Sequence, residues 1–284
     1  MKIHICADME GTCGVVSWLQ VTPPETAGGA PHKEAEYDRC RRRMTAEVSA
    51  AARGAFAAGA TEVTVNDFHN ANLNILIDEL DERCRLVAGG AGPLNFLQGM
   101  DPDCDGIFFT GFHSKAGTLA SALSHTWSTN LNDLRIAGAS TGEFGLISYV
   151  AGSFGVPVLL VTGDHTTCEQ TEAFLKRPVV KAVVKEGISQ TGAINLHPKA
   201  AQDIIERQAQ RAMQEVGRVE PSILPPNAVV ELEFDHQTRA DAAEKIHGVT
   251  RTDARTVAFH ASDGLDLLDN FLAVMRASYV RISP

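Results

Sequence analysis

The chain has 284 residues, of which 44% are hydrophobic and 21% charged, and 35 acidic against 25 basic residues give a net charge of −10 at pH 7. This length allows one large domain or two modest ones, with a core that needs no disulfide or metal to hold it. The composition excludes a disordered or fibrous chain. The negative charge opposes binding to nucleic acid or to an anionic membrane surface.

The six cysteines are scattered and form no C-x-x-C pair, so we expect reduced thiols. The N-terminus begins directly with a strand-like pattern and shows no signal-peptide core. The uncharged segment 144–163 contains glycines and Pro157, which favours helix, turn and buried strand over a membrane span. We therefore expect a soluble, cytoplasmic protein.

Short apolar runs alternate with helical patterns, which is typical of an α/β fold with a mostly parallel sheet and flanking helices. Strands are expected at 3–7, 62–66, 85–88, 105–110, 134–137, 156–162 and 179–184. Helices are expected at 34–58, 75–82 and 143–151. The first of these helices carries a run of arginines (39 and 41–43) beside acidic residues, which we interpret as a solvated, ion-pairing face.

After residue 192 the pattern becomes that of a smaller α+β unit. A polar helix at 198–216 and a proline-bearing linker come first. They are followed by strands at 229–234 and 256–260 and by helices at 241–246 and 264–280. We predict an α/β domain over 1–192 that carries the candidate site, and a smaller α+β domain over 193–284.

Acidic and imidazole side chains follow several of the expected strands. Asp8 and Glu10 come after the first strand, and their spacing projects both carboxylates to one face of an extended backbone. His69 and His113 follow two further strands, and Glu143 begins a helix. Because ligands bind beyond the carboxyl ends of the strands in open α/β sheets, these side chains are expected at one edge.

This set of side chains has the chemistry of a metal site. Carboxylate and imidazole are ligands of Zn²⁺ and similar ions, and adjacent carboxylates need a cation or a proton between them. Three carboxylates and two imidazoles exceed the needs of one catalytic zinc and are about enough for two. Each residue alone also fits a structural role, such as an acid at a helix N-terminus, so composition and spacing leave that alternative open.

A serine hydrolase is a competing interpretation. Residues 138–142 fit G-x-S-x-G, with Ser140 as the nucleophile between a strand and a helix. The acid and the histidine of a catalytic triad could be Asp164 with His197, His236 or His260. Against this, Arg135 interrupts the preceding strand, where a central apolar strand is usual. No phosphate-binding glycine motif is present, so a nucleotide-binding function is unsupported.

Five short motifs carry a resemblance to a known family. They occur in the order Asp8-Met9-Glu10-Gly11, Val65-Asn66-Asp67-Phe68-His69, Gly111-Phe112-His113, Leu123-Ser124-His125 and Gly142-Glu143-Phe144-Gly145-Leu146. Together they resemble the D-aminopeptidase family of self-compartmentalising zinc peptidases, first described as dipeptide-transport (DppA-type) proteins. The resemblance is clear to about residue 190 and weaker beyond. The loop from Gly11 to about Lys33 looks longer than the family norm. A longer loop could reshape the substrate entrance, and with it the preferred stereochemistry and length of the peptide.

The resemblance implies a dinuclear zinc site, with two Zn²⁺ per subunit. Asp8 would bridge both metals, Glu10 and His69 would complete one site, and His113 and Glu143 would complete the other. A hydroxide between the metals would then attack the peptide carbonyl.

The resemblance also implies a catalytic residue, a substrate and an assembly. His125 matches the family's catalytic histidine, which would stabilise charge or donate a proton to the leaving amine. The implied substrates are short peptides with N-terminal D-residues, D-Ala-D-Ala being typical, and the implied assembly is a ring-built decamer. A non-catalytic peptide-binding or transport-associated protein is the alternative outside enzyme chemistry.

Overall fold

The computed structural model describes residues 1–23, 33–90 and 92–282. The chain divides into two compact units, the first formed by Met1–Ser114, Leu119–Leu123 and Val156–Glu220, and the second by Lys115–Thr118, Ser124–Gly155 and Pro221–Pro284. This division differs from a boundary at residue 192, because the mid-chain segment pairs with strands near the C-terminus. No helix in the described ranges has the length and hydropathy that a membrane crossing needs.

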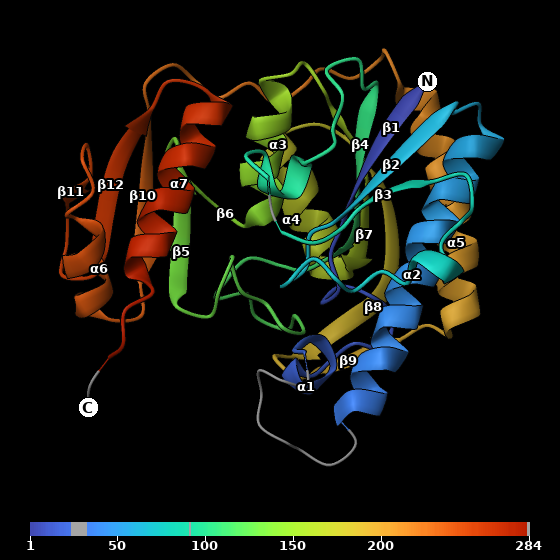
Figure 1. Cartoon of the computed structure of the whole chain (residues 1–284), viewed down its shortest axis with the longest axis horizontal. Coiled ribbons are helices and arrows are strands. Elements are labelled where there is room, and N and C mark those ends of the chain that lie inside the picture. The colour runs from blue at the N-terminus through green and yellow to red at the C-terminus, as the bar shows by residue number, and fades with distance from the viewer. Residues whose placement is uncertain (24–32, 91, 283–284) are drawn as a thin grey trace. The chain divides into compact units, whose positions relative to one another are not determined.

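The first unit is built on a seven-stranded sheet in the order β3-β2-β1-β4-β7-β8-β9 (Figure 1). Its strands are β1 (Lys2–Ala7), β2 (Glu62–Asp67), β3 (Arg85–Val87), β4 (Gly106–Phe112), β7 (Val158–Asp164), β8 (Val180–Ser189) and β9 (Gly192–Asn195). All neighbouring pairs are parallel except β8 with the edge strand β9. The expected mostly parallel sheet is confirmed.

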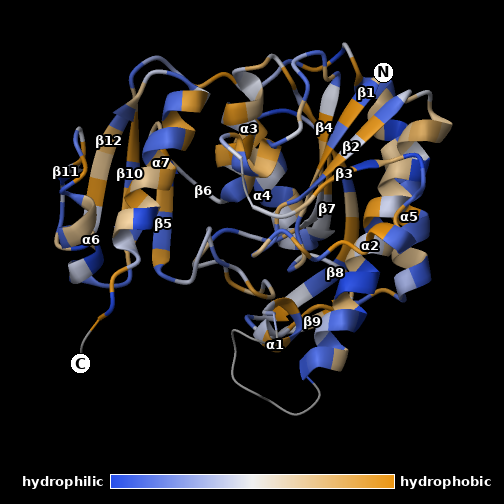
Figure 2. Ribbon diagram, viewed as in Figure 1, coloured by the Kyte–Doolittle hydropathy of each residue, from blue (hydrophilic) through white to orange (hydrophobic). Residues whose placement is uncertain are grey.

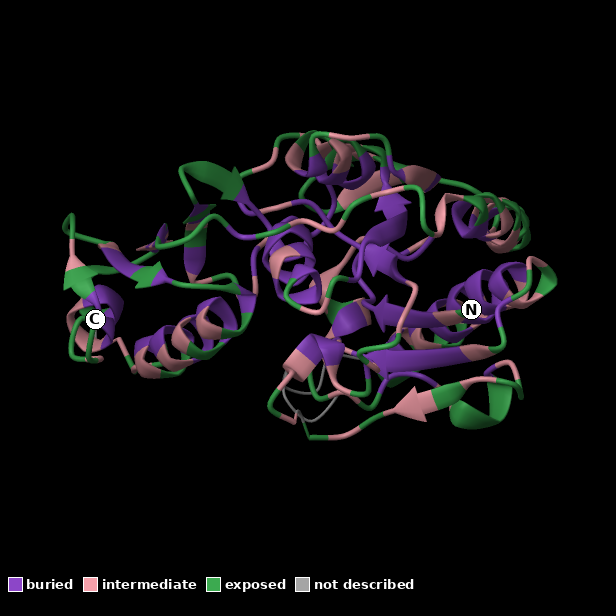
Figure 3. Cartoon of the chain, turned by 90° about the horizontal axis from the view of Figure 1, so that it is seen from above, coloured by how far each residue is buried: buried purple, intermediate pink, exposed green. Residues whose placement is uncertain are grey.

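Burial on both faces explains the sequences of the central strands. Every residue of β4 and β7 is buried, and these strands consist mainly of Phe, Ile, Leu and Val (Figures 2 and 3). Parallel strands covered by helices on both faces read as continuous apolar runs rather than as alternating patterns. The helices of this unit are α1 (Trp18–Val21), α2 (Lys33–Ala57), α4 (His165–Leu175) and α5 (Pro198–Ala212), with single 3-10 turns at Ile77–Glu79, Asn95–Leu97 and Met213–Glu215.

Helices α2 and α5 pack side by side (Figure 1). Gly54 permits this contact, because a Cβ there would lie 2.3 Å from the Glu206 carbonyl oxygen. The arginine run near the start of α2 forms ion pairs, with Arg39 to Glu36, Arg41 to Asp38 and Arg42 to Glu79. The interpretation of this run as an ion-pairing face is confirmed for these three arginines, whereas Arg43 donates to the Gly14 carbonyl at 3.2 Å.

The second unit contains a five-stranded antiparallel sheet in the order β11-β12-β10-β5-β6. Its strands are β5 (Leu131–Ile136), β6 (Ala139–Thr141), β10 (Ala228–Phe234), β11 (Thr250–Arg251) and β12 (Thr256–Ala261). Its helices are α3 (Glu143–Gly152), α6 (Gln237–Ala243) and α7 (Gly264–Ser278). The segment 144–163 forms most of α3, a turn and most of β7, as expected.

Several elements differ from the sequence expectations. The helix expected at 75–82 is only the 3-10 turn Ile77–Glu79, because the flanking residues Leu76 (φ −85°, ψ 101°) and Leu80 (φ −72°, ψ 150°) have extended backbones. The helix expected at 241–246 begins earlier, at Gln237, where His236 caps its N-terminus. The pattern also missed α1, α4, β6, β9 and β11. Part of the long loop between Gly11 and Lys33, residues 24–32, lies outside the described residues.

Candidate metal centre

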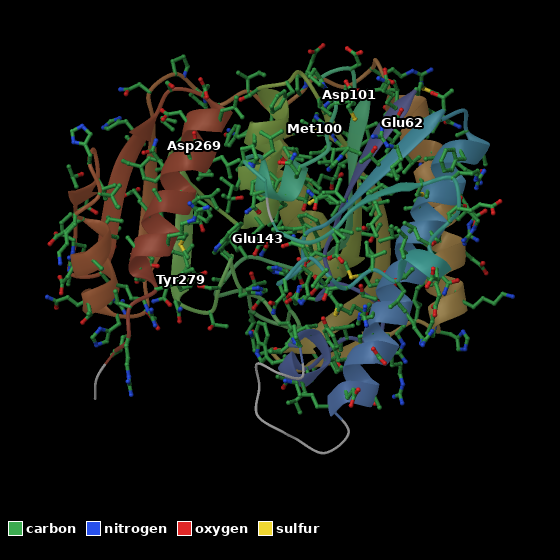
Figure 4. All side chains as sticks on the ribbon, in the orientation of Figure 1. Glu62, Met100, Asp101, Glu143, Asp269 and Tyr279 are labelled. Carbon is green, nitrogen blue, oxygen red and sulfur yellow. The ribbon has the colours of Figure 1, made fainter. Side chains whose placement is uncertain are left out.

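The carboxyl ends of three neighbouring strands bring four of the predicted side chains together. Strand β1 lies between β2 and β4, with Ala7 opposite both Asp67 and Thr110. The residues that follow these strands therefore meet at one edge of the sheet. Glu62, the first residue of β2, marks the opposite edge (Figure 4).

Asp8, Glu10, His69 and His113 form a buried cluster in the first unit. The His69 Nδ1 atom lies 3.1 Å from Asp8 Oδ1 and 3.0 Å from Glu10 Oε2. The His113 Nε2 atom lies 3.4 Å from Asp8 Oδ2. One ligand atom each from Asp8, Glu10 and His69 lies within 4.8 Å of the others, which is the spacing of groups that can share one ion.

In each imidazole, the nitrogen that faces away from Asp8 forms a hydrogen bond with a backbone carbonyl. The Nε2–H of His69 donates to the Val21 carbonyl oxygen at 2.6 Å. The Nδ1–H of His113 donates to the Ser114 carbonyl oxygen at 3.0 Å. Because a carbonyl oxygen only accepts, each of these bonds fixes which nitrogen keeps its proton, and in the neutral ring the other nitrogen offers the lone pair that a metal requires.

Two glycines allow the cluster to form. A Cβ on Gly11 would lie 1.8 Å from the Phe112 carbonyl oxygen. Gly111 has φ +67°, and a Cβ there would lie 2.2 Å from the Asp8 carbonyl oxygen. The Gly11 N–H donates to the Gly111 carbonyl at 2.7 Å and joins the two loops directly. Only glycine permits these approaches, which explains the glycine in each of the two motifs.

The electrostatics of the cluster favour a bound cation. Burial, and then the neighbouring Glu10 carboxylate, raise the pKa of Asp8 to about 7. Burial would lower the pKa of His69, but the Glu10 and Asp8 carboxylates outweigh it and raise that pKa well above its usual value. Within the described residues, Asp8 Oδ2 is buried and accepts no hydrogen bond. The carboxylate oxygens and imidazole nitrogens of this cluster fit a zinc ion, which would replace the protons on Asp8 and His69.

Asp67 holds the loop that carries His69, a function the sequence pattern did not identify. Its carboxylate accepts the backbone N–H groups of Asn74 (2.5 Å) and Ile75 (2.7 Å) and the Asn74 side-chain amide (2.8 Å). The side-chain amide of Asn74 donates in turn to the His69 carbonyl at 2.6 Å. The available signal was an acidic residue at the end of a buried strand, two positions before the histidine.

His125 and Glu143 belong to the second unit. Glu143 is the first residue of α3, is 5% exposed, and accepts the backbone N–H of Trp127 at 2.6 Å (Figure 4). A ring nitrogen of His125 lies within 4.8 Å of a Glu143 carboxylate oxygen. The structure thus brings together four of the predicted residues in the first unit and these two in the second.

The G-x-S-x-G motif at 138–142 is a β-hairpin rather than a nucleophile elbow. Ala137 (φ +51°) and Gly138 (φ +80°) form the turn between β5 and β6. Ser140 lies on β6, is exposed, and donates to Asp133 Oδ1 at 2.5 Å. An elbow requires a sharp turn from a strand into a helix with the serine at its apex. The hairpin removes the geometric basis for a Ser140 hydrolase.

A buried cluster of carboxylates and imidazoles at the carboxyl edge of an α/β sheet defines a metal-binding α/β protein. The model of the peptidase M55 family, described as D-aminopeptidase, matches residues 1–273, and the chain belongs to this family. A D-aminopeptidase of Bacillus subtilis (strain 168) is 31% identical over 284 residues, which cover 98% of this chain and 100% of that protein. A similar solved structure is described as "Zn-dependent D-aminopeptidase DppA from Bacillus subtilis, a self-compartmentalizing protease", with TM-score 0.91 and 30% identity over 100% of both chains.

Proposed function

We propose that this chain is a zinc-dependent aminopeptidase that hydrolyses short peptides with N-terminal D-amino acids. The observation that carries the proposal is the buried cluster of Asp8, Glu10, His69 and His113 in a member of the D-aminopeptidase family. The description of the solved relative as zinc-dependent supports the choice of metal.

Two zinc ions per subunit fit the residues. Asp8 would bridge them, because its two oxygens face different imidazoles, Oδ1 facing His69 and Oδ2 facing His113. Glu10 and His69 would complete one site, and His113 and Glu143 would complete the other, as the family resemblance implies. Bound zinc would supply a Lewis acid that activates water and polarises the scissile carbonyl.

In this proposal His125 is the acid–base group of the reaction. A histidine that does not bind metal can change protonation near neutral pH. It would stabilise the developing charge or donate a proton to the leaving amine. The acidic groups of the site would hold the free N-terminal amine of the peptide, which makes cleavage amino-terminal.

We also propose a closed homo-oligomeric ring assembly, a decamer as in the family resemblance, and a cytoplasmic location. The description of the relative as self-compartmentalizing supports an oligomer, and closed symmetry is the common outcome for soluble homo-oligomers. No disulfide joins the six cysteines within the described part of the chain, which agrees with a reducing compartment. Light scattering at micromolar concentration tests the assembly, and a fully active, stable monomer would contradict it.

Substrate preference is tested by comparing D-Ala-D-Ala, L-Ala-L-Ala and N-acetylated D-Ala-D-Ala on the zinc-loaded protein. The proposal expects rapid release of D-Ala from the first peptide only. Equal cleavage of the acetylated peptide would contradict the aminopeptidase specificity. Faster cleavage of the L-peptide would contradict the stereochemical preference while leaving the metal chemistry intact.

A further inference from the structure

A lysine is buried in the first unit, in contact with the turn that carries the proposed zinc ligands Asp8 and Glu10. Lys185 lies on β8 and is 2% exposed. Its ammonium donates to the carbonyl oxygens of Glu10, Thr12 and Val15 at distances between 2.5 and 3.2 Å. All three acceptors belong to the turn that follows β1, and one of them is the backbone of a proposed ligand.

Side chains from two other elements of the same unit also form hydrogen bonds with this turn. The buried Glu47 carboxylate on α2 accepts the Cys13 N–H at 2.9 Å. The Asn195 side chain on β9 accepts the Gly14 N–H at 2.7 Å. Buried backbone groups need partners, and in this turn side chains from distant parts of the chain provide them. The conformation of the turn therefore depends on these side chains.

The ammonium group suits this position for a geometric reason. Three carbonyl oxygens converge on one point, and an ammonium presents three donors from a single atom with no acceptor to leave unsatisfied. Burial lowers the pKa of Lys185 to about 8, and the carboxylates of Asp164, Glu47 and Glu10 oppose this shift and stabilise the buried charge. A neutral side chain would leave the three carbonyls without these bonds.

We propose that Lys185 is a positioning residue for the metal centre. By holding the Glu10 carbonyl and the turn beyond it, Lys185 fixes the direction in which the Glu10 carboxylate leaves the backbone. Zinc would then bind to ligands that are already in position, and no free energy of binding would be lost in ordering the turn. This inference rests on the proposed function in one respect, that Glu10 is a zinc ligand.

The test compares Lys185→Met with Lys181→Met in the full-length protein. Lys181 lies on the same strand, but its side chain is partly exposed and pairs with Glu172. Zinc affinity is measured by competition with a chromophoric chelator. Outer-shell partners of metal ligands typically contribute 10–100-fold in affinity. Lys185→Met should therefore bind zinc about 10–100-fold more weakly, whereas Lys181→Met should bind it as the wild type does.

Cobalt substitution separates positioning from a general loss of stability. The visible spectrum of bound Co²⁺ reports the geometry of its ligands, so Lys185→Met should change it and Lys181→Met should not. If Lys185→Met does not fold, Lys185→Arg becomes the deciding variant, and the same two measurements are made on it. The planar guanidinium spreads its donors and cannot reproduce three bonds from one atom, so weaker zinc binding and an altered spectrum are again expected.

Wild-type zinc affinity and an unchanged cobalt spectrum in the deciding variant would overturn the inference about Lys185. A wild-type protein that binds no zinc would instead contradict the proposed function. The two failures are therefore distinguishable in one experiment.

Discussion

The His113 imidazole faces the Asp8 carboxylate, with Nε2 3.4 Å from Oδ2. The other oxygen of that carboxylate is 3.1 Å from His69. One carboxylate thus presents each of its oxygens to a different imidazole, which is the arrangement that a shared ligand between two cations needs.

The first prediction concerns this shared carboxylate. Asp8→Ala should remove both zinc ions, because each site loses a ligand. Glu10→Ala and His113→Ala should each weaken mainly one site. Elemental analysis of the purified variants measures the stoichiometry. Retention of two zinc ions per chain by Asp8→Ala would refute the bridging role.

Zinc binding should release protons at mildly acidic pH. In the metal-free protein the pKa of Asp8 is raised to about 7 and that of His69 well above its usual value, so Asp8 and His69 together hold at least one proton at pH 6. Zinc requires the deprotonated forms, so binding should release at least about one proton and weaken as the pH falls below about 7. Calorimetry at pH 6 in buffers of different ionisation enthalpy counts these protons. A binding enthalpy independent of the buffer would argue against this electrostatic picture.

The proposed catalytic role of His125 can be tested separately from metal binding. His125→Ala should keep zinc and the oligomer but lose about 10²–10⁴ in turnover, the usual contribution of acid–base catalysis. Ser140→Ala is the matched control and should keep near-normal turnover, because Ser140 lies in a surface hairpin. Near-normal turnover in His125→Ala would exclude the catalytic role, and loss of metal would identify His125 as a ligand.

A further prediction concerns stability and pH through Glu47. Burial raises the pKa of Glu47 from 4.5 to about 7. The folded state therefore binds more protons than the unfolded state between these values, and stability falls as the pH rises through that window. Glu47→Gln removes this dependence. Its free energy of unfolding relative to the wild type should rise by about 2–3 kcal/mol between pH 5 and pH 8, at about 1.4 kcal/mol per pKa unit.

Urea unfolding of both proteins at the two pH values measures this change. Glu34→Gln, at an exposed position of the same helix, is the control and should differ from the wild type equally at both pH values. The same constant difference for Glu47→Gln would show that the Glu47 carboxyl does not titrate in this window.

The positions of Asp8, Glu10, His69 and His113 were predictable because one rule governs them. Parallel strands end at a common edge, so the residues after β1, β2 and β4 had to meet. The structure adds the reason for Gly11 and Gly111, since a Cβ at either position would collide with backbone atoms of the neighbouring loop. The central strands were also recognisable, because burial on both faces leaves continuous apolar runs.

Long-range contacts account for what the sequence could not predict. Lys185 reads as a surface lysine in a strand, since its Glu10 carbonyl acceptor lies 175 residues away in sequence. Helix α4 begins with His165 and two threonines, all of low helix propensity, and only its capping residue Asp164 signalled its start. The second unit takes β5 and β6 from mid-chain, which no local pattern indicates.

The release of D-Ala from D-Ala-D-Ala, measured before chelation, after it and after zinc is restored, tests the proposed function most directly. We predict that hydrolysis disappears with the zinc and returns with it, in proportion to the metal bound. Undiminished hydrolysis by zinc-free protein would contradict the proposal, as would a zinc-loaded protein that binds the dipeptide without cleaving it.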